Sequence, residues 1–146
     1  MKRFAFICLN VCLPLSVGAL FYWTFRPDAV VSGWLDVMFG ACPFRAAETE
    51  GSPCPPLIRN HLADFLWAYS FTAMQSVFGK RIRTVLAVSA GFTFLAEWAQ
   101  RFPGIPGVFD WCDVAVEWCA IIMAGASALV YRKTIRAKSR KEGESA

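Results

Sequence analysis

Charged residues are scarce in this chain, and their scarcity excludes most kinds of soluble protein. Asp, Glu, Lys and Arg make up 18% of the 146 residues, against about 25% in an ordinary soluble domain. A disordered chain needs high charge and low hydrophobicity, whereas 56% of this sequence is hydrophobic. A soluble domain of this size cannot bury so much apolar surface. The composition therefore predicts a small polytopic membrane protein.

Metal-ligand and nucleic-acid motifs are also missing from the sequence. It has one histidine, and its six cysteines form no Cys-x-x-Cys pair, so we expect no metal and no other cofactor. A net charge of +4 suggests nucleic acid only where basic residues cluster beside a folded aqueous surface. Here the basic stretch 132–141 directly follows an apolar run, which favours contact with anionic lipid headgroups. We therefore expect no nucleic-acid partner.

Four apolar runs are long enough to cross a bilayer, which takes about 20 helical residues. They lie at about 4–25, 62–79, 84–100 and 113–131. The first run is too long for a signal peptide and has no small-residue cleavage site, so it is interpreted as an uncleaved anchor. The predicted fold is all-α, with four transmembrane helices in a compact bundle. We expect one membrane domain over 1–131 and a basic cytoplasmic tail over 132–146.

The basic residues predict the orientation of these spans. With the N-terminus inside, the inner segments hold 11 of the 15 Lys and Arg residues. The 11 are Lys2, Arg3, Lys80, Arg81, Arg83, Arg132, Lys133, Arg136, Lys138, Arg140 and Lys141. The positive-inside rule then places both termini in the cytoplasm. The four residues at 80–83 also predict a tight antiparallel hairpin between the second and third spans.

The one long loop, 26–60, falls on the outer side in this orientation. Its apolar stretch 30–39 predicts a short helix lying in the outer interface. Cys42 and Cys54 share the loop and would meet an oxidising compartment. They are the candidates for a disulfide, and two free thiols are the alternative.

Ionisable residues gather where the predicted helices reach the outer side. Within membrane segments such residues are costly and are functional candidates by default. The candidates for catalysis are Glu97, Asp113, Asp110 and Glu117, and those for ligand binding are Gln100, Arg101, Arg59, His61 and Asp64. The alternative interpretation is a polar network that only fixes how the helices pack.

The spacing of these residues predicts shared helix faces. Glu97 and Arg101 are four apart and should be neighbours. Asp110, Asp113 and Glu117 follow at i, i+3 and i+7, which also falls on one face. Like charges at i, i+4 repel, so Asp113 and Glu117 should not both be ionised unless a positive charge lies near.

Small and aromatic residues predict how the helices pack. Ala120, Ala124 and Ala128 form a small-xxx-small stripe beside Gly125, and a similar face is expected at 87 and 91. Small residues let membrane helices approach closely. We interpret these stripes as packing faces of the bundle, with homodimerisation as the minority alternative. Four tryptophans, at 67, 98, 111 and 118, predict an aromatic belt at the outer interface.

The stretch EWAQRFPG at 97–104, followed by DWCD at 110–113, resembles the VanZ-like family of small bacterial membrane proteins. The pattern of that family is a Glu, a Gln three residues on, a Pro-Gly turn, an Asp opening the last helix and a Gly-rich helix. Glu97, Gln100, Asp113 and Gly125 match it in order. The resemblance covers roughly 60–125.

Two positions depart from the family pattern. Residues 105–107 are Ile-Pro-Gly where the family has an Arg, and Glu117 stands where it has an Asn. The family is named after an accessory protein of glycopeptide resistance. The resemblance therefore implies an envelope-related role in the bacterial inner membrane, without supplying a mechanism. Antibiotic resistance is an association of the family that many of its members do not share.

The leading hypothesis is a protein that binds or modifies an envelope component: a lipid headgroup, a lipid-linked precursor or a glycopeptide. Glu97 would act as general base or ligand anchor, Asp113 as its partner and Gln100 as an orienting group. Arg59 or Arg101 would hold an anionic group. Two facing carboxylates can also hold a divalent cation.

Two alternatives stay open. One is a non-catalytic scaffold or sensor module in the membrane. The other, less favoured, is a small transporter, because the polar residues keep to one leaflet. The expected partners are membrane lipids and a lipid-linked envelope substrate.

Overall fold

The computed structural model describes residues 2–26, 30–43, 55–79, 81–105 and 107–144, and all regular structure within them is helical. The elements are α1 (Lys2–Ile7), η1 (Cys8–Cys12), α2 (Leu13–Phe25), α3 (Val30–Phe39), α4 (Pro56–Phe78), α5 (Ile82–Ala99) and α6 (Trp111–Glu144). The predicted all-α class and the short helix at 30–39 are confirmed.

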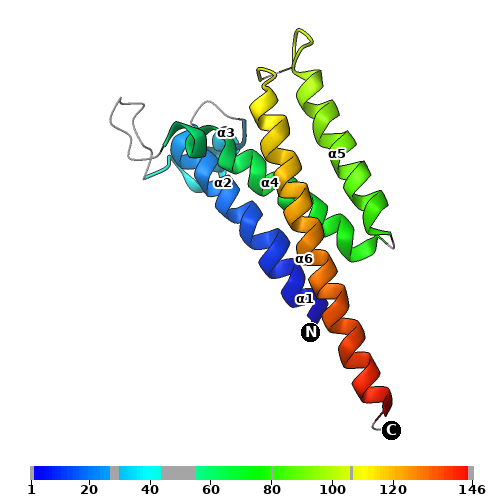
Figure 1. Ribbon diagram of the computed structural model, residues 1–146. Coiled ribbons are helices and arrows are strands. Elements are labelled where there is room, and N and C mark those ends of the chain that lie inside the picture. Colours follow the sequence, from blue (N-terminus) through cyan, green and yellow to red (C-terminus); the bar gives the residue numbers. More distant parts are fainter. Residues whose placement is uncertain (1, 27–29, 44–54, 80, 106, 145–146) are drawn as a thin grey trace.

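The first long helix widens at its centre because of a proline. Pro14 has no N–H, and its ring would clash with the carbonyl four residues back. The segment Cys8–Cys12 is a π-helix, and the N–H of Leu13 bonds to the carbonyl of Cys8, five residues back. This one-turn adjustment lets α1, η1 and α2 continue as a single rod (Figure 1).

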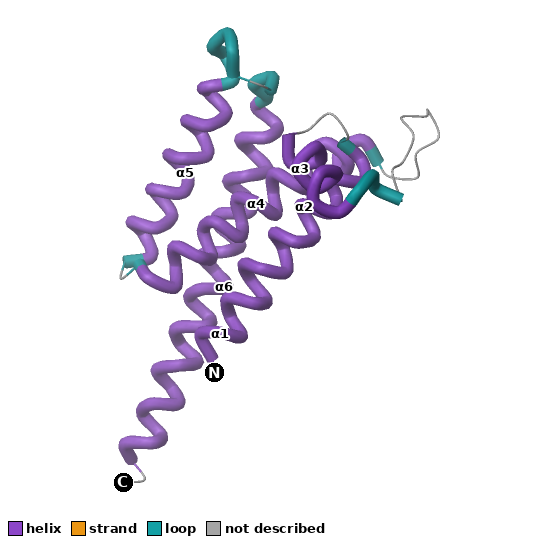
Figure 2. The backbone as a smooth tube through the Cα atoms, turned by 180° about the vertical axis from the view of Figure 1, so that it is seen from behind, coloured by secondary structure: helices purple, strands orange, loops and turns teal. Residues whose placement is uncertain are grey.

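The ends of the long helices fall into two groups (Figures 1 and 2). The start of α1, the end of α6 and the α4–α5 turn lie toward one end of the bundle. The end of α2, the short helix α3, the start of α4 and the α5–α6 turn lie toward the other. We call the second the α3 end, and it is where the predicted site residues are found.

Within the described residues, three helices are long and apolar enough to cross a membrane: Arg3–Phe25, Ile82–Ala99 and Trp111–Ile135. The predicted second span, 62–79, is helical but is not among them. It belongs to α4, which begins earlier than expected, at Pro56, because proline is well suited to the first turn of a helix. The predicted loop 26–60 therefore ends five residues early and also contains α3.

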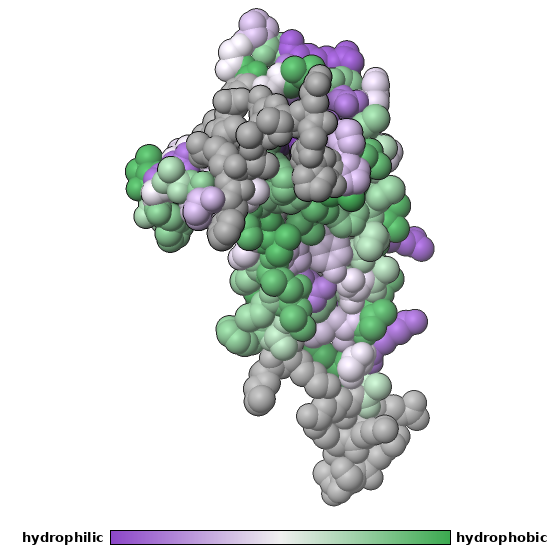
Figure 3. All heavy atoms as spheres, turned by 90° about the vertical axis from the view of Figure 1, so that its left-hand side faces the viewer, coloured by the Kyte–Doolittle hydropathy of each residue, from purple (hydrophilic) through white to green (hydrophobic). Residues whose placement is uncertain are grey.

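The hydroxyl residues in the second half of α4 face the interior of the bundle. Ser70 and Thr72 are fully buried and Ser76 nearly so, and each hydroxyl donates to a carbonyl one turn back in α4. Tyr69 donates to Asn10 and also lies 3.0 Å from Ser127. Large hydrophobic side chains instead cover much of the middle of the outside (Figure 3). Small residues inside and large apolar residues outside are typical of a protein whose solvent is lipid.

The alanine stripe of α6 is a packing face, as predicted. Ala120, Ala124 and Ala128 are at most 1% exposed, and α6 packs against α4 more extensively than any other pair of described elements. The similar face expected on α5 is wrong, because both Ala87 and Gly91 are exposed. Helix α5 instead turns Val85, Ser89, Thr93 and Glu97 inward.

Helix α6 continues as a helix well beyond the predicted span, to Glu144. Where it passes the end of α4, the Arg132 guanidinium donates to the carbonyls of Ser76 and Gly79. Carbonyls at a helix C-terminus lack intrahelical donors and carry partial negative charge. Arg132 thus caps α4 from the neighbouring helix.

Cys42 is buried. Cys54 lies outside the described residues, and the disulfide between these two residues stays a prediction.

Candidate functional site

Side chains from three helices meet at the α3 end. We call Asp64, Glu97, Asp113 and Glu117 the acidic cluster. Asp64 lies near the start of α4, Glu97 near the end of α5, and the other two in the first two turns of α6. The charges of Asp64, Asp113 and Glu117 all lie close enough to Glu97 to interact with it. The antiparallel course of α4, α5 and α6 produces this meeting, because each contributes the end that lies beside α3.

His61 and Asp113 form the shortest polar contact of the site. The His61 Nδ1 lies 2.5 Å from an Asp113 carboxylate oxygen, and the two side chains are 14% and 18% exposed. The pair joins α4 to α6. A carboxylate bonded to one ring nitrogen orients the imidazole and leaves Nε2 as the atom available for proton transfer.

Glu97 and Glu117 are the most deeply buried acids in the described part of the chain, 6% and 3% exposed. One oxygen of Glu97 accepts from Gln100 Nε2 at 3.2 Å. The buried Thr93 side chain lies near Glu117, and its hydroxyl donates to the carbonyl of Ala90 at 3.4 Å. The Oε2 atom of each glutamate is buried without a partner among the described residues. An unsatisfied buried oxygen is unfavourable by about 1–3 kcal/mol and more for a charged group. The site therefore holds two acceptors that a ligand donor would satisfy.

Two residues outside the predicted set complete the site. The Tyr22 hydroxyl donates to Asp64 at 2.7 Å, and the Arg26 guanidinium lies over the Tyr22 ring, 5.7 Å from its centroid. Arg26 is also close enough to Asp64 for their charges to interact. No spacing rule within one helix finds these residues, because Tyr22 lies 42 positions before Asp64. The only signal was their place at the outer end of the first apolar run.

Three predicted site residues lie elsewhere. The Asp110 side chain is exposed and caps α6 by accepting from the N–H of Cys112 at 2.8 Å; only its backbone N–H reaches Glu97. Arg101 stacks on the Trp98 and Phe109 rings, 4.4 and 4.1 Å from their centroids. Arg59 is half-buried in the first turn of α4, and neither arginine forms an ion pair within the described ranges.

The expected pairing of Glu97 with Arg101 is therefore wrong. Helix α5 ends at Ala99, so Arg101 leaves the helical face on which the four-residue spacing rests. The positive charges nearest the acidic cluster come instead from Arg26 and, when protonated, His61. A divalent cation is not favoured either, since no group of three His, Cys, Asp or Glu among the described residues is arranged to hold a metal.

The α5–α6 turn positions Gln100 against Glu97. Gly107 has φ of +119°, and a Cβ there would overlap the Gln100 amide. Gly104 has φ of +92°, with nothing within 4 Å of the place of a Cβ. Both positions disfavour L side chains through the backbone. Only Gly107 also makes room for the amide that donates to Glu97.

Gly107→Ala should destabilise the protein more than Gly104→Ala. Each substitution loses about 1–2 kcal/mol through the backbone, and G107A in addition loses the Gln100 hydrogen bond, about 1 kcal/mol. Thermal unfolding of the purified protein in detergent measures the difference. In a Gln100→Ala background the two variants should become equal. Equal effects in the wild-type background would show that Gly107 does not position Gln100.

Tyr22→Phe should lower the stability of the protein, whereas Tyr131→Phe should not. Y22F leaves Asp64 without its donor and should lower the free energy of unfolding by about 1–3 kcal/mol. The Tyr131 hydroxyl is buried without a partner in the described structure, so Y131F should leave stability unchanged or raise it. Unfolding monitored by circular dichroism distinguishes them. Matching losses would mean that the Tyr22–Asp64 bond does not stabilise the site.

Comparison with known proteins supplies no relative: no protein-family model, curated protein or solved structure matches the chain. Three of the four residues that carry the VanZ-like resemblance lie together at the α3 end, and the fourth, Gly125, lies nearer the other end of the bundle. Glu97 and Gln100 are bonded to each other, Asp113 interacts with Glu97, and Gly125 lies in the α5–α6 contact, where a Cβ would press on Leu86.

Proposed function

We propose that this is a four-span protein of a bacterial inner membrane, with α4 as the span beyond the three apolar helices. The 23 residues of α4 extend about 34 Å at 1.5 Å per residue, enough for a hydrocarbon core of about 30 Å. The buried hydroxyl residues Ser70, Thr72 and Ser76 face other helices rather than lipid, so their presence in α4 does not oppose insertion. The positive-inside rule then places both termini in the cytoplasm.

In this orientation the acidic cluster lies at the outer membrane–water boundary. Helix α3 supports this placement of the acidic cluster, because the helix exposes an apolar face suited to lying in a membrane interface. That face consists of Val31, Trp34, Val37, Met38 and Phe39. Trp98, Trp111 and Trp118, near the same ends of α5 and α6, are 39–61% exposed, as an aromatic belt requires.

The function we propose for the cluster is to bind, and where chemistry occurs to modify, an envelope component. The observation that carries it is the pair of buried glutamates with an unpartnered oxygen each, close to the His61–Asp113 pair. These acceptors suit a group that donates hydrogen bonds: an ammonium or the hydroxyls of a headgroup, lipid-linked precursor or glycopeptide. The VanZ-like resemblance is consistent with an envelope-related ligand.

The geometry also assigns roles for an acid–base step. Asp113 orients His61, whose Nε2 would take or give the proton. Glu97 and Glu117 would hold the donor group of the ligand, and Gln100 would keep Glu97 in place. Arg26 takes the position near the cluster that Arg59 or Arg101 was expected to fill, so it is the candidate for an anionic group on the ligand.

Analysis of co-purifying small molecules tests this proposal. The full chain, purified in mild detergent and extracted for mass spectrometry, should carry an envelope component at near-stoichiometric amount. Asp113→Asn and Glu97→Gln should each lower its amount about tenfold, the effect of losing one charged hydrogen bond. Asp110→Asn is the matched control, since Asn caps helices as well as Asp.

Two results would overturn the proposal. The first is that no component is enriched over a detergent blank. The second is equal retention by D113N, E97Q and D110N, which would leave the polar residues as a packing network and favour the scaffold hypothesis.

A further inference from the structure

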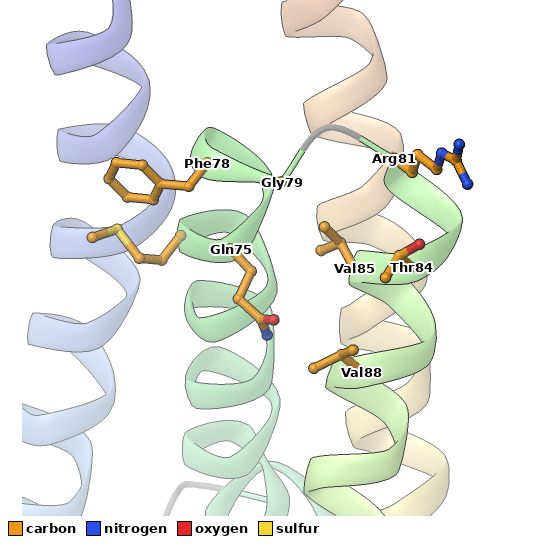
Figure 4. A pocket seen from close by; sticks show the side chains of 8 residues that line it. Gln75, Phe78, Gly79, Arg81, Thr84, Val85 and Val88 are labelled. Carbon is orange, nitrogen blue, oxygen red and sulfur yellow. The ribbon is translucent and has the colours of Figure 1, made fainter.

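A groove lies at the opposite end of the bundle from the acidic cluster. It is an open groove of about 660 Å³ between the end of α4 and the start of α5. The residues that line it are Met74, Gln75, Phe78, Gly79, Arg81, Thr84, Val85 and Val88. Val85 and Val88 point from α5 toward α4, and Arg81 extends outward from the turn (Figure 4). The volume falls within the range of about 300–1,000 Å³ that small-molecule sites occupy.

The walls of the groove suit a hydrocarbon chain. Met74, Phe78 and Val88 are 39%, 73% and 52% exposed, so apolar surface is left open along its length. The polar lining residue deepest between the helices, Gln75, is already satisfied, because its amide donates to Ser89 at 2.9 Å. The part of the groove between the two helices therefore does not require a polar ligand.

The mouth of the groove suits a negative charge. No acidic residue lines it, and Arg81 is exposed and forms no ion pair within the described ranges. Helix α5 begins here with no side chain capping its first N–H groups and no acid in its first turn. Free N–H groups and the helix dipole add to the attraction that Arg81 exerts on an anion.

We propose that this groove binds one phospholipid with a net negative headgroup. An acyl chain would lie along the apolar walls, and the phosphate would pair with Arg81 at the start of α5. Charge complementarity favours this occupant over a zwitterionic lipid. The groove is separate from the acidic cluster, and this proposal does not depend on the function proposed above.

Native mass spectrometry of the full chain in detergent tests the headgroup preference. The probes are equal amounts of palmitoyl-oleoyl phosphatidylglycerol and the corresponding phosphatidylcholine. The wild type should retain one phosphatidylglycerol in preference, and Arg81→Gln should reduce that preference about fivefold, the contribution of one arginine near an anionic surface. Arg83→Gln is the matched control. It removes one positive charge two residues further along the chain, from a residue that does not line the groove.

A second pair of variants tests the chain-binding part of the groove. Val88→Trp fills the groove and should abolish the bound lipid, whereas Leu95→Trp, on an exposed position of the same helix outside the lining, should not. Both replace an exposed apolar residue, so folding should be retained, and circular dichroism verifies it. Equal losses in R81Q and R83Q, equal retention by V88W and L95W, or no preference in the wild type would each overturn the proposal.

Discussion

Glu117→Gln should make the protein harder to unfold and at the same time remove its envelope component. Glutamine keeps the shape of the side chain, but it carries no charge. Glu117 is 3% exposed and has one oxygen without a partner in the described structure. At alkaline pH, where this carboxyl is ionised, removing the buried charge should raise the free energy of unfolding by about 1–3 kcal/mol.

Loss of the carboxylate should also weaken any ligand that it anchors. We expect the amount of co-purifying component to fall about tenfold, since a hydrogen bond to a charged group contributes about 1.5–3 kcal/mol. Thermal unfolding and mass spectrometry of the same preparation measure both quantities. A glutamate that serves only to pack the helices predicts the reverse pattern, with lower stability and unchanged retention.

A substitution that raises stability and weakens ligand binding is expected at a binding site. A site that keeps polar groups unsatisfied in the free protein stabilises its ligand when they pair. Asp110→Asn should change neither quantity, because its side chain is exposed and caps α6. If E117Q left both stability and retention unchanged, Glu117 would have no part in the site.

Ala124→Leu should be the most destabilising change in the apolar part of the bundle. Ala124 is fully buried in a cluster with Phe6, Val11, Ala73 and Ala128. Three added carbons cannot fit between α6 and its neighbours without moving a helix. Overpacking of this kind lowers the free energy of unfolding by about 1–3 kcal/mol, and sometimes by more.

Ala126→Leu is the matched control for this substitution. Ala126 lies on the exposed side of the same helix, so A126L should change the stability by less than about 0.5 kcal/mol. Unfolding in detergent, followed by circular dichroism, compares the two variants. Equal effects would show that the spacing of α4 and α6 is not set by the alanine stripe. Because His61 and Asp113 join the same two helices, A124L should also reduce retention of the envelope component.

Local properties of the sequence were sufficient to predict most of the helices. Apolar runs of sufficient length predicted three of the long helices to within a few residues at most ends, and the stretch 30–39 predicted α3. Alanines four apart predicted the packing face of α6, since that spacing repeats on one side of a helix. These predictions succeed because helix length, periodicity and apolar character are carried by neighbouring residues.

Helix boundaries were the first place where this reasoning failed. Four-residue spacing joined Glu97 to Arg101, but α5 ends at Ala99 and the arginine stacks on two aromatic rings instead. A three-residue spacing placed Asp110 with Asp113, although Asp110 is the cap of α6 rather than part of its inner face. A rule based on helical period holds only as far as the helix continues.

From the residue order alone, one can determine that this chain is helical, that several of its helices are apolar enough to cross a membrane, and that acids lie near the ends of those helices. Which acid meets which partner depended on the packing of α2, α4, α5 and α6. Tyr22 reaches Asp64, His61 reaches Asp113, and Arg26 replaces the expected arginines. Contacts across 42 and 52 positions are set by helix rotation and approach, which arise from side chains distributed over the whole bundle.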